Sequence, residues 1–331
     1  MINKKKLLFP YIIAEIGSNN NGSILKAKKL IKAAKSAGCD AVKFQSWNEN
    51  LYNLNTLTNS ELSNIKKLVM TPIKLKLLRN FAKKIKIDFG TTVFDEPQLK
   101  DALKINCDFI KIASMDCNNY PFLKKVLKIK KPVIISTGFT SPKELRKTIN
   151  ISNKSKKKNI FFLHCVSIYP PKYEQLNINN IKYLKKITKK IVGFSDHSIG
   201  TYAAILATTA GAKIIEKHFT FNKKAIGADH KISADLVEMK KLVLECKNVS
   251  KTLGKFKREI SKQEYKISLN MRRSVYAKKN ITKNEIFTFN NLCIHRPGDG
   301  LGPEYLEKIV SKKAKINIQK GKKISLSMIV N

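Results

Sequence analysis

The chain has 331 residues, of which 43% are hydrophobic and 27% are charged, so it can bury a large core, and its length allows about two domains. Its 65 lysines and arginines against 24 aspartates and glutamates give a formal net charge of +41, which attracts polyanions or anionic small molecules without specifying either. No apolar run approaches the roughly 18 residues that cross a bilayer as a helix, so we expect a soluble protein.

The lysines are spread along the whole chain. The densest runs, 154–158 and 184–190, fall where we expect solvated helix or loop surface. Nucleic-acid binders usually gather their charge on one face or one tail, often beside stacking aromatic residues. We therefore interpret the excess as a compositional bias and disfavour a nucleic-acid partner, while an attraction for phosphate groups stays open.

Cysteine usage and the first residues bear on the compartment. The six cysteines form no C-x-x-C pair and no regular framework, and residues 1–6 lead into no hydrophobic segment of signal length. We expect a reduced, cytoplasmic protein.

Short β-rich runs alternate with amphipathic helical patterns along most of the chain. We predict eight strands, at 11–16, 41–45, 87–91, 109–112, 132–136, 160–164, 191–195 and 213–216. Apolar residues at helical spacing predict helices at 24–37, 72–84, 97–103, 142–149 and 202–210. Eight β-α units in about 250 residues are typical of a (β/α)8 TIM barrel. A doubly wound sheet is the alternative, but no G-x-G-x-x-G follows the first strand.

The pattern changes after Leu253. We predict a barrel domain at 1–255, a polar, helix-prone linker at 256–270 and a small β-rich domain at 271–331. The short strands of the small domain are predicted at 272–277, at 286–289 and within 312–329.

Two histidines fall at the ends of the last two predicted barrel strands. The carboxyl ends of parallel strands meet at one rim, so His197 and His218 can reach one point there. Two imidazoles suit a divalent metal that keeps positions open for water and substrate oxygen. Strand alternation places Ser195 on the face of His197 and turns Asp196 away, which excludes a hydrolytic triad within this run.

Lysines interrupt two otherwise apolar strands. Lys43 and Lys111 are each costly to bury unless they meet an anion. Hydroxyl donors stand at neighbouring strand ends, at Thr92, Ser114 and Ser136. Together these residues predict a pocket for a small phosphate or carboxylate.

A carboxylate closes the first strand. Glu15, at a barrel mouth beside a metal and an anion site, is a candidate general acid or base, and capping of the next helix is the ordinary alternative.

With these residues assembled, the chain resembles the sialic acid synthase family, which includes N-acetylneuraminate and N,N'-diacetyllegionaminate synthases. The resemblance runs from about residue 12 to the C-terminus. It is carried by eight motifs in order, Ile-Ile-Ala-Glu-Ile-Gly (12–17), Asp-Ala-Val-Lys-Phe-Gln (40–45), Phe-Ile-Lys-Ile-Ala-Ser (109–114), Ile-Ser-Thr-Gly (135–138), His-Cys-Val-Ser-Ile-Tyr-Pro (164–170), Phe-Ser-Asp-His (194–197), Glu-Lys-His-Phe-Thr (216–220) and Gly-Ala-Asp-His-Lys (227–231). The C-terminal segment is similar to the small antifreeze-protein-like (SAF) domain that ends these synthases.

The resemblance implies a condensation of phosphoenolpyruvate with an N-acetylated amino sugar aldehyde, giving a nine-carbon 2-keto sugar acid and phosphate. It implies Mn²⁺ or Mg²⁺ on His197 and His218, and a domain-swapped homodimer in which Arg296 of the partner subunit reaches the sugar. Phosphoenolpyruvate would be held by Lys43, Thr92, Lys111, Ser114, Ser136, Ser167 and Ser195. Catalytic or sugar contacts would come from Glu15, Gln45, Tyr169 and Asp229.

Several positions depart from the family pattern. The run 19–22 reads Asn-Asn-Asn-Gly where Asn-His-Asn-Gly is common, so Asn20 replaces a histidine, and the run 91–94 reads Thr-Thr-Val-Phe where Ser-Thr-Pro-Phe is usual. The segment between Gln45 and Pro72 is short, and Ser167 stands where some relatives have asparagine. These differences bear on the choice of sugar.

Three alternatives stay open from the sequence. They are a related synthase that makes pseudaminate, a polyanion-binding protein on an inactive barrel, and an aldolase-type enzyme with a Schiff-base lysine at Lys43 or Lys111.

Overall fold

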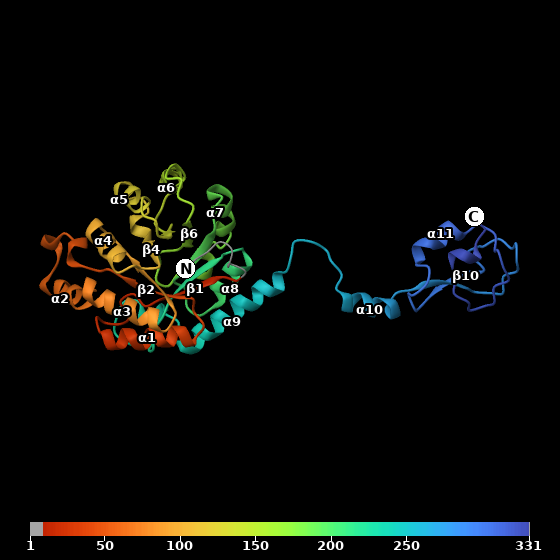
Figure 1. The fold of residues 1–331 in the computed structure, drawn as a ribbon, viewed down its shortest axis with the longest axis horizontal. Coiled ribbons are helices and arrows are strands. Elements are labelled where there is room, and N and C mark those ends of the chain that lie inside the picture. The colour runs from red at the N-terminus through yellow and green to blue at the C-terminus, as the bar shows by residue number, and fades with distance from the viewer. Residues whose placement is uncertain (1–8, 331) are drawn as a thin grey trace. The chain divides into compact units, whose positions relative to one another are not determined.

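The computed structural model describes residues 9–330, so the basic stretch 1–6 lies outside the described residues. Eight parallel strands pair in chain order and close into a barrel, because the eighth pairs with the first (Figure 1). The strands are β1 (Tyr11–Glu15), β2 (Ala41–Gln45), β3 (Asp88–Thr92), β4 (Phe109–Ile112), β5 (Val133–Ser136), β6 (Ile160–Cys165), β7 (Val192–Asp196) and β8 (Ile214–His218). The predicted TIM barrel is confirmed, with each strand within two residues of its predicted bounds.

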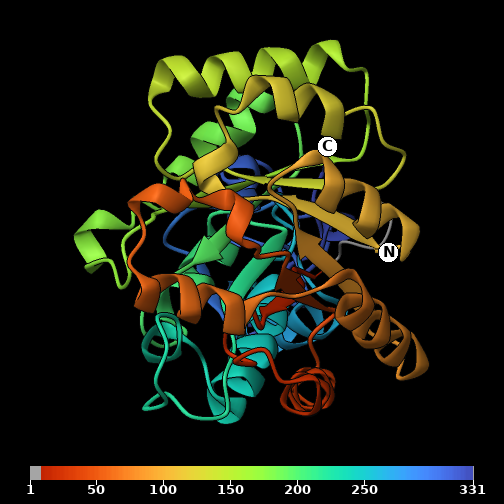
Figure 2. The same cartoon turned by 90° about the vertical axis from the view of Figure 1, so that its left-hand side faces the viewer.

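Helices surround the strands on the outside of the barrel (Figure 2). They are α1 (Ile24–Ser36), α2 (Asn59–Leu68), α3 (Pro72–Lys84), α4 (Glu96–Lys104), α5 (Tyr120–Val126), α6 (Pro142–Lys154), α7 (Asn180–Thr188), α8 (Tyr202–Thr209) and α9 (Leu236–Leu253). Their starts follow from local sequence. In α6, Ser141 and Glu144 form a capping box around Pro142, which satisfies free backbone N–H groups at the helix start.

Alternate residues of the strands point into the barrel and form two layers. The lower layer is apolar and consists of Tyr11, Ile13, Ala41, Phe109, Ile134, Phe161, Leu163 and Ile214. Gly90 makes room for it, because a Cβ there would lie 2.2 Å from the Phe109 ring. The next inward positions carry polar side chains, and the register places Glu15 opposite both Lys43 and His218. The interior of the barrel therefore has an apolar layer below a layer of charged and polar side chains.

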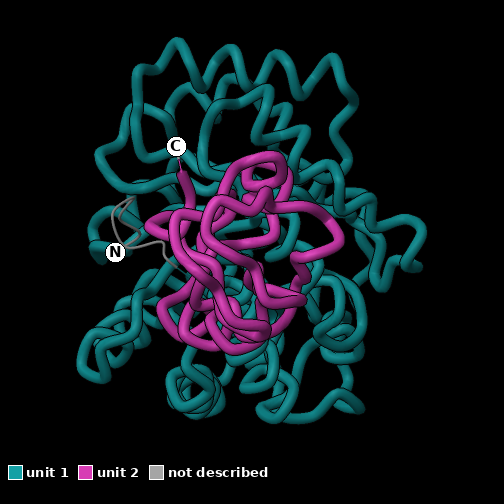
Figure 3. The backbone as a smooth tube through the Cα atoms, turned by 90° about the vertical axis from the view of Figure 1, so that its right-hand side faces the viewer, with its two compact units in different colours: residues 1–254 teal, residues 255–331 magenta. Residues whose placement is uncertain are grey.

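Residues 255–331 form a second compact unit (Figure 3). It contains α10 (Lys262–Met271), the antiparallel pair β9 (Ser274–Ala277) and β10 (Leu292–His295), and α11 (Leu306–Ile309). Its own small core is separate from the barrel core and consists of Val275, Ala277, Ile281, Phe287, Leu292, Ile309, Ala314, Ile318, Ile324 and Ile329.

The strands predicted at 286–289 and within 312–329 are wrong, because these ranges contain only isolated bridges, and the sheet partner of β9 is β10. The Asn291 side chain accepts from the amide of Thr288 (2.8 Å) and donates to the carbonyl of Ile286 (2.9 Å). These local bonds fold the segment into a turn and occupy groups that a strand ladder needs. Single bridges, such as Ile286 to Lys313, replace a continuous third strand.

Across residues 9–330, no helix combines the length and the apolar character required to cross a membrane.

Candidate active site

A cavity of about 200 Å³ lies at the carboxyl ends of the barrel strands, the face where TIM barrels bind ligands. Twelve of the fourteen predicted site residues line it, namely Glu15, Lys43, Gln45, Thr92, Lys111, Ser114, Ser136, Ser167, Tyr169, Ser195, His197 and His218. Asp229 lies beside it, with a carboxylate oxygen 3.6 Å from Nδ1 of His218. Arg296 belongs to the second unit.

Two lysines and two glutamates share the bottom of this cavity. Nζ of Lys43 lies 3.2 Å from Glu15 and 3.5 Å from Glu216, and Nζ of Lys111 donates to Glu216 at 3.0 Å. Each of the four side chains is at most 5% exposed. Burial of these charges is tolerated because they pair with one another. A bound anion would enter a site whose cations are already fixed in place.

The two carboxyl groups have opposite protonation preferences. Burial raises the pKa of Glu15 to about 7, although Lys43 beside it favours the charged form. Burial also opposes ionisation of Glu216, but Lys111 and Lys43 outweigh it and hold the pKa of Glu216 well below its usual range. Neighbouring groups with pKa values pushed apart mark an acid–base site. Glu15 is therefore the group that can exchange a proton near neutral pH, and Glu216 is a fixed anion.

Hydroxyl groups complete the polar lining. Thr92 accepts from Lys43 (2.9 Å) and Ser195 donates to Glu216 (2.9 Å). The Ser136 hydroxyl is buried and has no hydrogen-bond partner among the described residues. A buried polar group without a partner calls for an explanation, and a ligand in the cavity supplies one.

The loop after β5 comes close to two of these hydroxyls. A Cβ on Gly138 would lie 2.2 Å from Oγ of Ser167 and 2.8 Å from Oγ of Ser114, so any larger residue there would displace both hydroxyls. The Gly138 amide donates to Ser114 at 3.1 Å.

The two histidines lie together, with ring centroids 5.6 Å apart. Nδ1 of His197 donates to the carbonyl of Val166 (2.8 Å), which leaves Nε2 as a lone-pair donor. Burial lowers the pKa of His218 to about 4, with Asp229 opposing, so this imidazole is neutral as a metal ligand must be. Its Nδ1 makes no hydrogen bond within residues 9–330.

These donors fit a divalent metal. Within the described part of the chain, no cluster of three or more His, Cys, Asp or Glu side chains has metal-ligand geometry. Two imidazoles alone would leave most of the coordination sphere of a metal ion open to water and substrate, and Lewis-acid catalysis requires open positions of this kind.

A buried ion pair fixes the strand ends that carry the histidines. Nζ of Lys217 lies 2.9 Å from Asp196 and also donates to the carbonyl of Ser198. The other carboxylate oxygen of Asp196 accepts from the amide and hydroxyl of Ser198. The Lys217 and Asp196 side chains are fully buried and face away from the cavity. Asp196 directly precedes His197, and Lys217 directly precedes His218. The ion pair therefore holds the ends of β7 and β8 together next to the two histidines.

The run of asparagines braces the loop after β1. The Asn19 side chain donates to the carbonyl of Phe219 (3.0 Å) and to Ser233 (2.8 Å), and that of Asn20 donates to the carbonyl of Gly17 (2.8 Å). Ser18 donates to Asp229 at 3.0 Å. This loop therefore positions Asp229. The Asn20 side chain points toward the backbone of the same loop.

Sequence reasoning missed several lining residues. Glu216 is the most important, and strand alternation could have identified it because it stands two residues before His218 on the same strand. Cys165 lies 3.8 Å from Nδ1 of His197. Trp47, the single tryptophan, donates to Gln45, whose amide donates to Glu15 at 2.8 Å. Phe139 lines the mouth.

The closed barrel carries paired buried charges, an acid–base carboxyl and two histidines at the carboxyl ends of its strands. This arrangement defines a TIM-barrel enzyme. The model of the NeuB family matches residues 30–258, and that of the SAF domain matches residues 272–330. The chain belongs to the NeuB family and is an enzyme of the sialic acid synthase type.

Known relatives cover nearly the whole chain. The N,N'-diacetyllegionaminic acid synthase of Campylobacter jejuni is 37% identical over 92% of this chain and 96% of its own length. A pseudaminic acid synthase of Campylobacter jejuni is 35% identical over 94% of both chains. The solved N-acetylneuraminic acid synthetase of Leptospira borgpetersenii, in complex with citrate, has a TM-score of 0.74 at 35% identity and covers 78% of this chain and 90% of that one.

Proposed function

We propose that the enzyme condenses phosphoenolpyruvate with an N-acetylated amino sugar aldehyde. Carbon 3 of phosphoenolpyruvate bonds to the aldehyde carbon, water adds to carbon 2, and phosphate leaves. Phosphoenolpyruvate, aldehyde and water are thereby converted to a nine-carbon 2-keto sugar acid and phosphate. The observation that carries the proposal is the buried Lys43, Lys111, Glu15 and Glu216 cluster beside two histidines.

The cluster suits phosphoenolpyruvate because that substrate carries a phosphate and a carboxylate. Lys43 and Lys111 supply fixed positive charge, and the free hydroxyl of Ser136 supplies a hydrogen bond. The remaining contacts are assigned to the hydroxyls that surround them, namely Thr92, Ser114, Ser167 and Ser195. A Schiff base on Lys43 is disfavoured, because Glu15 and Glu216 outweigh burial and raise the pKa of this lysine. Burial outweighs Glu216 at Lys111 and lowers the pKa of that lysine, so Lys111 is the remaining candidate for the Schiff-base alternative.

The sugar is assigned to the upper part of the cavity. Glu15 is the proton-transfer group, and Gln45 orients it through the 2.8 Å hydrogen bond. Tyr169 stacks on His197 with centroids 4.1 Å apart, which places an aromatic wall at the mouth. Asp229, held by Ser18, is the hydrogen-bond acceptor for sugar hydroxyls.

His197 and His218 would hold the metal, which we propose to be Mn²⁺ or Mg²⁺. When bound, it would supply Lewis-acid polarisation of the aldehyde and order a water molecule. A reducing compartment such as the cytoplasm remains part of the proposal, on the ground that the sequence has no C-x-x-C pair and no regular cysteine framework.

The sugar is best identified by a substrate panel. Phosphate release and product mass should be measured with N-acetylmannosamine, with 2,4-diacetamido-trideoxyhexoses of the legionaminate type, and with those of the pseudaminate type. We expect one of the three to give a nine-carbon keto acid in amounts equal to the phosphate released. If all three left phosphate release at the level of the sugar-free reaction, the acceptor assignment would be wrong.

Glu15→Gln should lower turnover by about 10²- to 10⁴-fold, because it removes the group that exchanges a proton near neutral pH. Phosphoenolpyruvate binding should change little, since Lys43 and Lys111 remain. Trp47, as the only tryptophan and a cavity residue, reports that binding by fluorescence. Loss of turnover that is matched by an equal loss of phosphoenolpyruvate affinity would contradict a proton-transfer role.

We also propose that Arg296 of a second copy of this chain completes the site. In its own unit, the loop that carries Arg296 is braced by Ser274, which donates to the carbonyl of Pro297 (2.8 Å) and accepts from Gly300 (2.9 Å). Arg296 is exposed, and no described residue pairs with it. Around the barrel mouth, Phe139 and Ile226 are 74% and 95% exposed, which suits cover by a partner subunit.

Arg296→Ala should raise the Michaelis constant for the sugar more than that for phosphoenolpyruvate. Arg258→Ala is the matched control, because Arg258 is an exposed arginine of the same unit that only pairs with Glu264. Unchanged sugar kinetics in the Arg296 variant would rule out the role.

Co-expressing the Glu15→Gln and Arg296→Ala chains tests the exchange itself. In a swapped dimer, each mixed dimer contains one site without either substitution, so random mixing restores about a quarter of the wild-type sites. At low sugar concentration we expect activity well above that of either variant alone. If each site is built from one chain, mixing gives only the average of the two variants.

A further inference from the structure

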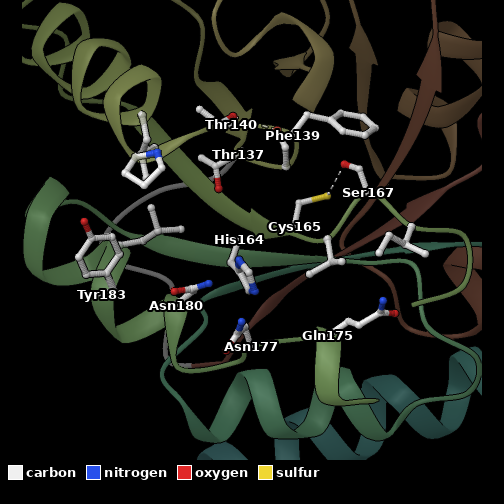
Figure 4. A pocket seen from close by; sticks show the side chains of 16 residues that line it. Thr137, Phe139, Thr140, His164, Cys165, Ser167, Gln175, Asn177, Asn180 and Tyr183 are labelled. Atoms are coloured by element: carbon white, nitrogen blue, oxygen red, sulfur yellow. Dashed lines mark hydrogen bonds between the residues drawn. The ribbon is translucent and has the colours of Figure 1, made fainter. Parts of the chain in front are cut away.

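A second and larger cavity, of about 470 Å³, lies next to the catalytic one. It is bordered by the loop that follows β5, the end of β6 and the start of α7 (Figure 4). Its floor is buried and includes His164 and Leu184, whereas its rim carries the exposed side chains of Asn180 and Tyr183. Its volume is in the range of small-molecule sites.

The lining of this cavity is neutral. Among the described residues, no Asp, Glu, Lys or Arg contributes to it, although the chain has 65 lysines and arginines. The adjacent catalytic cavity, in contrast, is lined by two lysines and two glutamates. A phosphate or carboxylate would find no counter-charge in the second cavity, so its chemistry favours an uncharged ligand.

Several polar groups in the lining have hydrogen-bonding capacity that the protein does not use. Nε2 of His164 lies 2.7 Å from the carbonyl of Leu176 and must donate, because a carbonyl only accepts. This tautomer leaves Nδ1 as an acceptor, and burial lowers the pKa of His164 despite that hydrogen bond, which keeps the ring neutral. The side chains of Asn177, Asn180 and Tyr183 make no hydrogen bond to any described residue.

These groups match a neutral sugar. Amides, a phenol and a neutral imidazole can exchange hydrogen bonds with hydroxyl and acetamido groups, and the rings of Tyr183 and Phe139 offer flat apolar surfaces. In Figure 4, Asn177 and Asn180 lie near His164, so these polar groups come together at one place.

We propose that the second cavity binds an uncharged N-acetylated monosaccharide, at a site distinct from the one where phosphoenolpyruvate reacts. The wall between the two cavities is shared, because Phe139, Cys165 and Ser167 line both. A ligand in the second cavity would therefore contact residues that also form the wall of the catalytic cavity. Only the choice of an acetylated sugar as the probe rests on the proposed function. The inference that the ligand is uncharged and polar rests on the lining of the cavity alone.

The test is a ligand-observed NMR titration with N-acetylmannosamine, without phosphoenolpyruvate or metal. Asn180→Trp fills the rim of the cavity from an exposed position, and Lys182→Trp is the matched control, because Lys182 is an exposed residue of the same helix outside the lining. Tyr183→Ala is a second variant that removes the aromatic surface. His218→Ala leaves this cavity intact and alters only the catalytic one.

Each rim variant is compared in an Asp229→Ala background, which removes the sugar contact assigned to the catalytic cavity. There we expect the dissociation constant to rise at least tenfold with Asn180→Trp and several-fold with Tyr183→Ala, and to stay within twofold with Lys182→Trp. His218→Ala should retain binding, N-acetylglucosamine should compete, and N-acetylmannosamine 6-phosphate should not. Wild-type binding in both rim variants, or complete loss in His218→Ala, would overturn the proposal. If no amino sugar supports turnover but Asn180→Trp still loses binding, the proposed reaction fails while this site stands.

Discussion

Replacing His218 with alanine should lower phosphate release from phosphoenolpyruvate by at least about a thousandfold. Lewis-acid stabilisation by a bound metal contributes several kcal/mol to a transition state, and each 1.36 kcal/mol is a factor of ten in rate. His218 is one of two imidazoles at the mouth, and its low pKa keeps it neutral and ready to bind a metal. The measurement is phosphate release at saturating substrates, with and without added Mn²⁺.

Two readouts separate loss of the metal from loss of the fold. Binding of Mn²⁺, followed by electron paramagnetic resonance, should weaken strongly in His218→Ala. Phosphoenolpyruvate binding, followed by Trp47 fluorescence, should stay within about threefold, because the charged lysine–glutamate cluster is untouched. A variant that kept a tenth or more of wild-type turnover would exclude the assigned role, whereas chelation of the wild-type enzyme should reproduce the loss and added Mn²⁺ should reverse it.

Lys217→Met should lower the free energy of unfolding of the barrel by about 3–5 kcal/mol, because it leaves the Asp196 carboxylate buried without its countercharge. Trp47 lies in the barrel, so its fluorescence during urea unfolding follows that unit separately from residues 255–331. The effect should be among the largest of any single substitution outside the cavity.

Two comparisons test the cause. Asp196→Asn combined with Lys217→Met removes both charges but leaves an acceptor for the Ser198 amide, so at least half of the lost stability should return. Lys100→Met removes a lysine whose pair with Glu96 is exposed, with the lysine side chain 66% exposed, and should cost at most about 1 kcal/mol. If Lys217→Met were as mild as Lys100→Met, the buried pair would not be what fixes the two strand ends.

The barrel strands were predictable because each one is a short β-rich run between helical patterns, and alternation sorted their side chains. Ser195 and His197 line the cavity while Asp196 faces away, as the period of two requires. The same rule applied to β8 would have turned Glu216 inward with His218. Glu216 was not predicted because its contacts with Lys43 and Lys111 join strands that are far apart in the sequence and meet only in the closed barrel.

Other features depend on packing that a single sequence does not encode locally. The second cavity arises where the β6 end, α7 and the β5 loop meet, and only the fold brings Thr140 and Asn180 to one space. In the C-terminal unit, side-chain hydrogen bonds from Asn291 override the β propensity of 286–289. Trp47 follows a strand at a loop position where no periodicity applies.

The large positive charge also takes on a clearer meaning. Of the three lysines within barrel strands, Lys43 and Lys111 line the cavity and are buried against carboxylates, whereas Lys217 faces away from it and pairs with Asp196. Most others, such as Lys154 or Lys185, are exposed on helices. Exposed lysines of this kind agree with a compositional bias. Their attraction for phosphate groups would raise the rate at which an anionic substrate reaches the protein and would not change the chemical step.

The central claim is that one cavity joins phosphoenolpyruvate to an amino sugar. The most direct measurement is phosphate release from phosphoenolpyruvate in four mixtures, with and without the amino sugar panel and with and without Mn²⁺. We predict release only when sugar and metal are both present, in a one-to-one ratio with the nine-carbon keto acid. Release that needs neither sugar nor metal would contradict the account.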